Sequence, residues 1–281
     1  MIDNEFSDTD AAAQERVFTY MKKLQRIIKN SYDYRFLLTQ LIVRNIKLKY
    51  RKSYLGVCWS LIEPLMTMIV LSFVFGTLLG RGDKYFPIYV LSGRLMYSFF
   101  SVGTKSAMKS IRKNASIIKK VYVPKYMYPL SSCTSAFVIF TVSLIDLFLV
   151  MVVMRMDISL RLLGAILPVL VLYLFTYGVG MLLTSVNVFF RDVEYMWDVG
   201  LMIIMYTSAI FYKLESFAES GKDVLFRLNP LCSLIQCFRN CIYGEPMEWN
   251  WLLYALGVSV LCSALGLLIF KKKQDEFVLH V

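Results

Sequence analysis

The sequence has few of the residues from which enzymes build reactive centres. It contains one histidine, the penultimate residue His280, and its six cysteines include no CxxC pair, which argues against a metal site. The phosphate-binding pattern GxxxxGK[ST] is absent, as are HExxH, GxSxG and GxGxxG. We therefore expect no catalytic residue, no metal and no cofactor in this chain, and no ATP hydrolysis through a P-loop.

Charge is also scarce. Charged residues make up 18% of the chain, against about 25% in soluble proteins. Hydrophobic residues make up 57%, and the mean hydropathy is +0.56. This composition argues against a cytosolic enzyme and against disorder, and it predicts a polytopic membrane protein. Since a membrane helix needs about 20 apolar residues, the 281 residues leave room for six spans and their loops, but for no further globular domain.

Apolar runs predict an all-α membrane protein with six transmembrane helices. The runs cover residues 57–79, 86–107, 128–154, 160–188, 195–212 and 249–270. A seventh apolar stretch, residues 224–243, is interrupted by Arg227, Asn229, Pro230 and Arg239. Because proline cannot continue a helix and charge is unfavourable at mid-bilayer, we expect re-entrant helices hinged at Asn229 and Pro230, in an extracellular region 217–245 before the last span.

Basic residues indicate the orientation of the chain. In a soluble protein a net charge of +11 would suggest nucleic acid, but in a membrane protein basic loops fix topology, and we expect no nucleic-acid partner. Six spans with a cytoplasmic N-terminus place 22 of the 31 Lys and Arg residues on the inner side and eight on the outer side. Both termini are therefore expected in the cytoplasm. The acidic N-terminal tail, residues 1–16, has no apolar core and does not resemble a cleavable signal.

Residues 17–54 are basic and aromatic, and they are too charged to cross the membrane. Apolar residues recur there at near-helical spacing, with cations on the other side. This pattern predicts an amphipathic helix in the membrane interface, although an ordinary solvated helix has the same pattern. Four cations near the first span are candidates for binding lipid phosphates: Arg44, Lys47, Lys49 and Arg51.

The inner loop between the second and third expected spans, residues 105–127, contains a basic helix candidate at 110–120. It could dock a cytoplasmic partner, or it could be a basic loop that only enforces topology. Its candidate contact residues are Arg112, Lys113, Ile117, Ile118, Lys119 and Lys120.

Three ionisable residues, Glu63, Arg94 and Asp146, lie within expected spans, where such residues are the default functional candidates. An ion-coupled transporter would use them as ion sites. The alternative, which we favour, is that Glu63 lies at the interface while Arg94 and Asp146 meet a polar cavity or one another. Ion coupling has thin support because the helices around these residues are not broken.

Several segments, in one order, resemble signatures of the ABC-2-type export permeases. Residues 44–70 read RNIKLKYRKSYLGVCWSLIEPLMTMIV, so that a basic interfacial helix leads into the first span. Further similar segments are IIKKVYVPKYMYPL at 117–130, NVFFRDVEYMWDVG at 187–200 and NPL at 229–231. The resemblance covers residues 35–270, and it is stronger to the polysaccharide and teichoic acid exporters than to the drug exporters.

The resemblance implies a homodimeric permease of a bacterial plasma membrane, working with two separate ATPase subunits that bind ATP and magnesium. The implied substrate is a lipid-linked glycan of O-antigen, capsule or teichoic acid type, moved from the inner to the outer leaflet. The implied permease domain is residues 55–271, followed by a cytoplasmic tail at 272–281. The coupling helix that meets the ATPase corresponds to residues 110–120, and Arg191 and Asp192 are assigned to the same contact.

A glycan has polar hydroxyls and apolar C–H faces, so its channel should offer aromatic rings as well as hydrogen-bonding groups. The channel candidates are Trp59, Glu63, Arg94, Tyr97, Asp146 and Tyr206. Other functions stay open. The same fold could export a drug or a small lipid, the chain could be an ion-coupled transporter, or it could be a membrane-embedded transferase that uses Asp192 and Glu194.

Overall fold

The computed structural model describes five stretches of the chain, and every regular element within them is helical. The stretches are residues 34–51, 53–78, 84–120, 123–212 and 226–277. The expected all-α fold is confirmed for this part of the chain. Four expected features lie wholly or partly outside it, namely the acidic tail (1–16), the start of the interface helix (17–33), part of the expected re-entrant region (217–225) and the end of the C-terminal tail (278–281).

In chain order the described helices are α2 (Arg35–Tyr50), η1 (Gly56–Cys58), α3 (Trp59–Leu71), η2 (Ser72–Leu78), α4 (Phe86–Lys113), α5 (Ala115–Ile118), α6 (Met127–Val153), η3 (Leu160–Ala165), α7 (Ile166–Asn187), α8 (Val193–Thr207), α11 (Pro230–Tyr243) and α12 (Trp249–Lys273). α3 runs on into the π-helical η2, and η3 runs on into α7, so each pair forms one longer helical segment.

Four of these segments are long and apolar enough to cross a membrane: Gly56–Phe75, Met127–Val153, Leu160–Asn187 and Trp249–Lys273. They coincide with four of the six expected spans. The other two expected spans correspond to α4 and α8, which are not simple apolar rods. α4 has 28 residues, but it includes Arg94 and a basic C-terminal end. α8 has only 15 residues, because the helix ends at Thr207.

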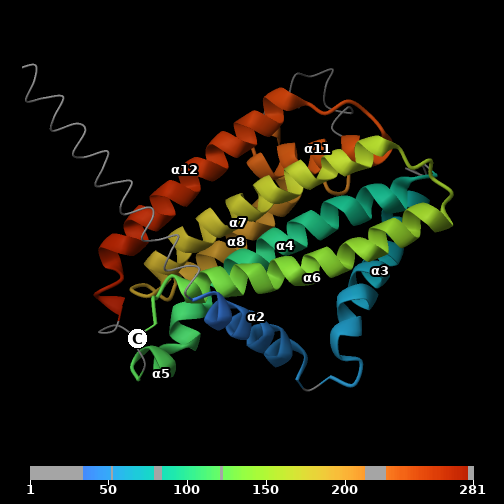
Figure 1. Ribbon diagram of the computed structural model, residues 1–281. Helices are drawn as coiled ribbons and strands as arrows, with labels where there is room; N and C mark the ends of the chain where they lie inside the picture. The colour runs from blue at the N-terminus through green and yellow to red at the C-terminus, as the bar shows by residue number, and fades with distance from the viewer. Residues whose placement is uncertain (1–33, 52, 79–83, 121–122, 213–225, 278–281) are drawn as a thin grey trace, which may run out of the picture.

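The centre of the bundle consists of α4, α6, α7 and α12 (Figure 1). α4 packs against α6 and α7, and α7 packs against α12. Between α4 and α7 the rings of Phe100 and Phe175 stack with their centroids 5.1 Å apart. We call the end that holds the C-termini of α4 and α12 the basic end, because Arg112, Lys113 and Lys271–Lys273 lie there.

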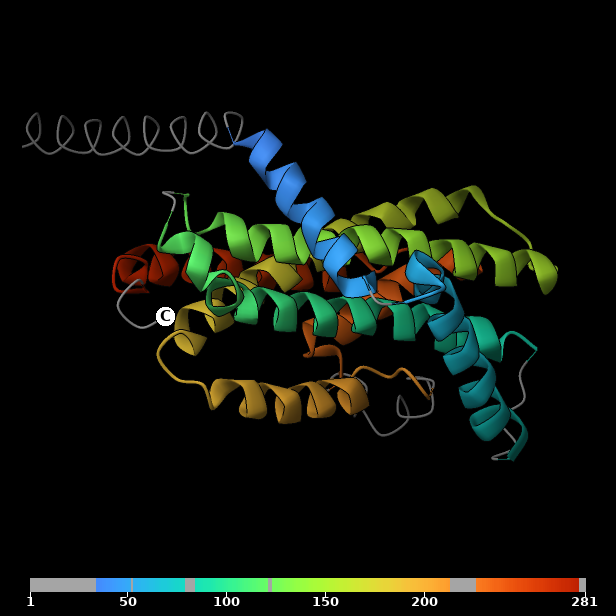
Figure 2. The ribbon, with the colours of Figure 1, turned by 90° about the horizontal axis from the view of Figure 1, so that it is seen from below.

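The remaining helices lie around this centre. Figure 2 shows α2 running obliquely across α6, and α8 lying along α4 on the other side. α3 leans away from the bundle and contacts α4 and α6, whereas α11 is buried against η3, α4, α7 and α12. Many large apolar side chains on the outside are exposed, among them Val153, Met196 and Leu268. Such a surface is expected of helices that face lipid.

α7 and α12 approach each other closely because both have glycine where they cross. A Cβ atom added to Gly178 would lie 2.6 Å from the backbone nitrogen of Ser263, and one added to Gly266 would lie 2.8 Å from the carbonyl oxygen of Gly178. The Ser263 hydroxyl also donates a 3.1 Å hydrogen bond to the carbonyl of Leu174. Small residues permit this contact, and close packing stabilises helix pairs in lipid, where the hydrophobic effect does not hold helices together.

We predict that Gly178→Ala lowers the free energy of unfolding by roughly 1–3 kcal/mol, since the added methyl group forces the two backbones apart. Gly257→Ala on α12 is the matched control, because nothing lies within 4 Å of its added Cβ atom. Thermal unfolding of the protein purified in detergent measures the difference. Equal melting temperatures for the two variants would show that the crossing is not closely packed.

Candidate functional site

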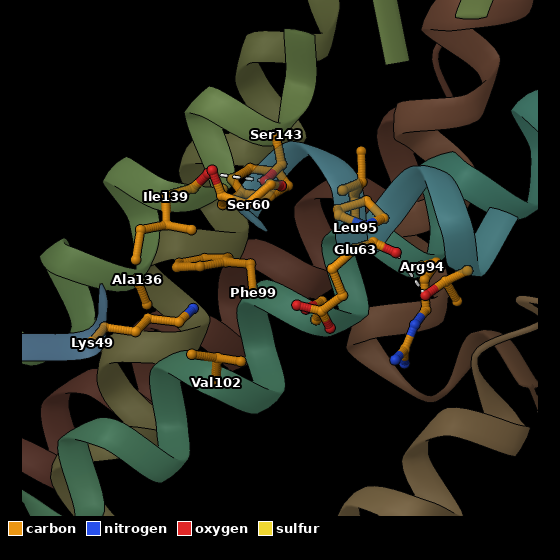
Figure 3. Close-up of a pocket in the computed structure, with 14 residues that line it drawn as sticks. Lys49, Ser60, Glu63, Arg94, Leu95, Phe99, Val102, Ala136, Ile139 and Ser143 are labelled. Carbon is orange, nitrogen blue, oxygen red and sulfur yellow. Dashed lines mark hydrogen bonds between the residues drawn. The ribbon is translucent and has the colours of Figure 1, made fainter. Parts of the chain in front are cut away.

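A groove of about 80 Å³ opens where the end of α2 and the start of α3 meet α4 and α6. We call it the lateral groove (Figure 3). Its lining combines charged, hydroxyl-bearing and apolar side chains. The charged residues are Lys49, Glu63 and Arg94; the hydroxyl-bearing residues are Ser60, Thr67, Ser98 and Ser143; the apolar residues include Phe99 and Phe140.

Both signs of charge meet an aromatic ring in the lateral groove. Lys49 and Glu63 extend from α2 and α3 toward Phe99, which comes from α4 (Figure 3). The guanidinium of Arg94 points away from Glu63 and lies 5.8 Å from the centroid of the Tyr97 ring. Partial burial lowers the pKa of the Lys49 ammonium, and the Glu63 carboxylate opposes this shift. The groove therefore offers a cation, an anion and a flat apolar face within one space.

The structure brings together two of the six channel candidates. Glu63 and Arg94 line the lateral groove. Trp59, at the start of α3, and Tyr206, on α8, are both exposed. Tyr97 is buried, and its hydroxyl donates a 2.9 Å hydrogen bond to a backbone carbonyl of α8. The prediction for Trp59, Tyr97 and Tyr206 as channel residues has no support from this groove.

Asp146 does not line the lateral groove. It is buried in α6, with 2% of its surface exposed. Its Oδ2 atom has no hydrogen-bond partner among the described residues. From the sequence we expected Arg94 and Asp146 to meet either a polar cavity or one another. Arg94 lines the lateral groove, which is polar. In the described ranges no ion pair joins Arg94 to Asp146.

Three of the four cations proposed to bind lipid phosphate share one side of α2. Arg44, Lys47 and Arg51 line a shallow groove along the helix. Lys49 lines the lateral groove instead. Positions 44, 47 and 51 are spaced by three and four residues, which places them on one face of a helix, whereas position 49 falls on another face. α2 thus presents Arg44, Lys47 and Arg51 along one groove and Lys49 to the lateral groove.

The basic helix expected over residues 110–120 is divided in the structure. α4 continues to Lys113, and Asn114 ends it, with its side chain donating a 2.7 Å hydrogen bond to the Ser110 carbonyl. A short polar side chain that bonds the backbone in this way competes with helix continuation. The candidate contact residues are consequently distributed over the last turn of α4 (Arg112, Lys113), α5 (Ile117, Ile118) and the exposed residues after it (Lys119, Lys120).

Ion pairs that the sequence analysis missed join α4 to α8 at the basic end. Glu194 of α8 lies 2.9 Å from Lys109 and 3.0 Å from Arg112. One turn further along α8, Asp198 lies 2.6 Å from Lys105. We call these five residues the polar clamp. Its signal in the sequence is a matched spacing, since acids four residues apart on one helix face cations four residues apart on the other.

Glu194 is the centre of the polar clamp. It also accepts a 3.3 Å hydrogen bond from the side chain of Asn187, which donates a 3.1 Å bond to the Met108 carbonyl as well. Partial burial raises the pKa of this carboxyl, but hydrogen bonds from Lys109 and Asn187, with the charges of the two cations, outweigh burial and hold the pKa of Glu194 below its ordinary value. Glu194 is therefore ionised near neutral pH.

Arg191 and Asp192, which the resemblance assigns to the ATPase contact, are exposed in the turn before α8. Among the described residues, neither of them takes part in an ion pair. Their exposure leaves them accessible to a second protein. Their role in coupling stays a prediction.

Arg239 of α11 holds the opposite end of α8 and was also missed as a site residue. It is 1% exposed. Its guanidinium donates hydrogen bonds of 2.8 Å to the Ala209 carbonyl and 3.3 Å to the Ile210 carbonyl, just after α8 ends. It also donates a 2.9 Å bond to the carbonyl of Tyr89 and lies 3.4 Å from the centroid of that ring. A Cβ atom on Gly93 would lie 2.6 Å from Nη2, so glycine makes room for the guanidinium.

The expected hinge at Asn229 and Pro230 is the start of α11. The Asn229 side chain accepts a 3.1 Å hydrogen bond from the Leu231 backbone, which caps the helix. The same side chain donates bonds of 3.0 Å and 3.1 Å to the hydroxyls of Thr207 and Ser208 at the end of α8. Pro230 takes the first helical position, where a missing N–H leaves nothing unpaired. We call Arg239 and Asn229 together the buried anchor.

We predict that Arg239→Lys lowers the free energy of unfolding by roughly 1–3 kcal/mol, because one ammonium cannot reach carbonyls on two chain segments and leaves buried acceptors unpaired. Arg161→Lys is the matched control, since Arg161 also donates to a backbone carbonyl, that of Gly244, but is exposed. Thermal unfolding in detergent provides the comparison. If the Arg239 variant melts no lower than the control, the buried anchor does not stabilise the fold.

A helical membrane protein with a polar lateral groove, a charged clamp between helices and no nucleotide-binding motif is a protein of the permease class. This chain belongs to the ABC-2 type transporter family, which residues 37–243 match. The family expected from the sequence is thereby confirmed.

Relatives of this chain are permease and transport proteins. Over 255 residues it is 26% identical to the O-antigen export system permease protein RfbA of Klebsiella pneumoniae, an alignment that covers 89% of this chain and 98% of the relative. The protein of the same name from Myxococcus xanthus is 26% identical over 254 residues, covering 90% and 98%. The polysialic acid transport protein KpsM of Escherichia coli is 22% identical over 247 residues, covering 85% and 93%.

Proposed function

We propose that this protein is the membrane permease of an ATP-driven exporter that moves a lipid-linked polysaccharide from the inner to the outer leaflet of a bacterial plasma membrane. One observation carries the proposal. The chain is similar over nearly its whole length to permeases of O-antigen export and to a polysialic acid transport protein. Since the chain has no P-loop motif, the energy is supplied by two ATPase subunits that bind ATP and magnesium.

The lateral groove suits a carbohydrate. Sugars present hydroxyl groups that bond to charged and hydroxyl side chains, and C–H faces that pack against aromatic rings. Glu63 and Arg94 supply the charged partners, and Phe99 supplies the ring. The basic face of α2, with Arg44, Lys47 and Arg51, suits the phosphate that links glycan to lipid.

The lateral groove also supports a homodimer. Charged side chains that face lipid are unfavourable, and in membrane proteins they normally face protein or a water-filled cavity. A second copy of the chain against this side would enclose Glu63 and Arg94 in a path between the two subunits. In the proposed dimer each subunit spans the membrane six times, with α4 and α8 as the less apolar spans, α11 as part of a re-entrant region and both termini in the cytoplasm.

The competing functions have weaker support. A transferase would use Asp192 and Glu194 as acid and base, but Glu194 is held in ion pairs and its lowered pKa makes it a poor proton donor near neutral pH. Asp146, on which an ion-coupled transporter would depend, lies outside the lateral groove. Export of a drug or small lipid uses the same fold and is separated from polysaccharide export by the substrate that accumulates.

The first experiment tests the substrate and the energy source. In cells that lack this protein we expect lipid-linked glycan to accumulate at the inner leaflet, because the transfer step is missing. The purified chain should hydrolyse no ATP alone and should transport glycan only with the P-loop ATPase encoded beside its gene. ATP turnover or glycan transport by the chain alone would contradict the proposal. Altered drug sensitivity without glycan accumulation would identify a drug exporter.

The second experiment tests the lateral groove. We predict that Arg94→Gln lowers the glycan export rate roughly tenfold, the effect of losing one charge-assisted contact, while binding of the ATPase is unchanged. Arg155→Gln, at an exposed arginine after α6, is the control and should export at the wild-type rate. Equal rates for the two variants would exclude the groove from the glycan path.

A further inference from the structure

α8 is held to the bundle by a line of polar contacts along α4. Of its 15 residues only Leu201 is buried. Starting from the polar clamp, the next contact toward the opposite end is a 3.0 Å hydrogen bond from the Trp197 indole to the Thr104 hydroxyl. The Tyr97 hydroxyl then bonds the Leu201 carbonyl at 2.9 Å. α8 therefore runs antiparallel to α4 along a seam of polar contacts, beside which Trp197, Ile204 and Met205 pack against the apolar core.

The contacts at the two ends of α8 differ in how easily water can replace them. At the polar clamp the side chains of Lys105 and Lys109 are 41% and 52% exposed, and that of Asp198 is 55% exposed. Ion pairs in such positions exchange readily with water and are weakened by salt. The contacts of Lys105, Lys109 and Asp198 can thus exchange with water, whereas Glu194 and Arg112 are only 25% and 26% exposed and form the less accessible part of the polar clamp.

The opposite end of α8 cannot separate so easily. Arg239 and its carbonyl partners at Ala209 and Ile210 are buried. The Tyr89 hydroxyl adds a 2.7 Å hydrogen bond to the Tyr212 carbonyl in the same region. Breaking these bonds would leave polar groups unpaired inside the protein, which is far more costly than exposing an ion pair.

We propose that Glu194 is a positioning residue for transport: it holds the basic end of α8 on α4, and its release lets α8 pivot about the buried anchor. This inference rests on the proposed function, in which a separate ATPase drives transport, and on the coupling contact that the resemblance assigns to residues 110–120, which include α5. Arg112, in the last turn of α4, lies three residues before α5 begins and is paired with Glu194. If the ATPase displaces α5, the movement therefore passes to Arg112 at the end of α4 and, through the ion pair between Arg112 and Glu194, to α8.

The first arm of the test measures the position of α8 without any ATPase. Cysteines placed at Lys105 and Asp198 are joined by a short bifunctional thiol reagent in membranes, in a Cys58→Ser background, because Cys58 is an exposed free thiol. We expect Glu194→Gln to lower the crosslinking yield at least about fivefold, the lower limit of a typical coupling effect. Glu245→Gln, at an exposed glutamate far along the chain, should leave the yield unchanged. An unchanged yield in the Glu194 variant overturns the proposal.

The second arm measures transport with the ATPase present, in chains with native residues at 105 and 198. We expect Glu194→Gln to reduce glycan export at least about fivefold, while ATPase binding and ATP hydrolysis persist. The charge swap Glu194→Lys with Lys109→Glu should restore most of the export because it restores an ion pair between the helices, whereas a role that needs the carboxylate itself at position 194 predicts no recovery. Wild-type export by the Glu194→Gln variant, or no recovery in a folded swap variant, overturns the assignment.

The two arms separate this inference from the proposed function. If the wild-type protein exports no glycan with ATP and the ATPase, the proposed function fails, and with it the role of Glu194 in transport. The crosslinking arm still reports whether Glu194 holds α8 against α4. If wild-type export is normal and only the variant results disagree with expectation, the inference fails alone.

Discussion

The polar surface of α4 is the constraint on which the arrangement of the other helices depends. A helix in a bilayer must pair its charged groups inside the protein or bring them to water. α4 carries Arg94 in its first half and a row of cations toward its C-terminal end. α8 contributes acids that pair with the cations of α4, α3 contributes Glu63 to the lateral groove that Arg94 also lines, and α11 contributes Arg239, which bonds the Tyr89 carbonyl at the opposite end. The helices are therefore placed around α4 by charge as well as by shape.

Two kinds of helix contact divide the protein into a rigid part and a separable part. α7 and α12 meet through glycines at distances that admit no side chain. Such a contact has one arrangement, because any slide brings side chains into the backbone. α8 meets α4 through hydroxyls and ion pairs, which water or new partners can replace. A transport protein must change shape to let its substrate through, and we expect that movement at the polar contacts between α8 and α4.

The sequence was sufficient for the class, the apolar helices and part of the lateral groove. Runs of apolar residues identify a membrane helix directly. Glu63 and Arg94 could be selected because a charged side chain inside such a run is energetically costly and therefore indicates a function. The end of α4 was less predictable. Asn114 stops the helix by bonding its own turn, and residues 110–120 have a basic, helix-like composition on both sides of that stop.

The polar clamp was missed because α8 turns acidic as well as apolar residues toward the bundle, so that Leu201 is buried in the core while Glu194 and Asp198 pair with α4. In a soluble protein the apolar face of a helix points inward. In α8 the large apolar residues Tyr195, Met196 and Val199 are exposed, and the face with Glu194 and Asp198 turns toward α4. Arg239 escaped notice for a related reason, since only the fold shows that its neighbours are carbonyls at the end of another helix.

The lateral groove and the seam along α8 meet on α4 through two residues one turn apart. Arg94 lines the groove and rests over the ring of Tyr97, whose hydroxyl bonds the Leu201 carbonyl of α8. If α8 moves, Tyr97 loses its acceptor on α8. The ring that supports the Arg94 guanidinium then lacks this hydrogen bond. A shift of α8 that begins at the basic end thus alters the lateral groove directly, because α4 contributes residues both to the groove and to the contacts with α8.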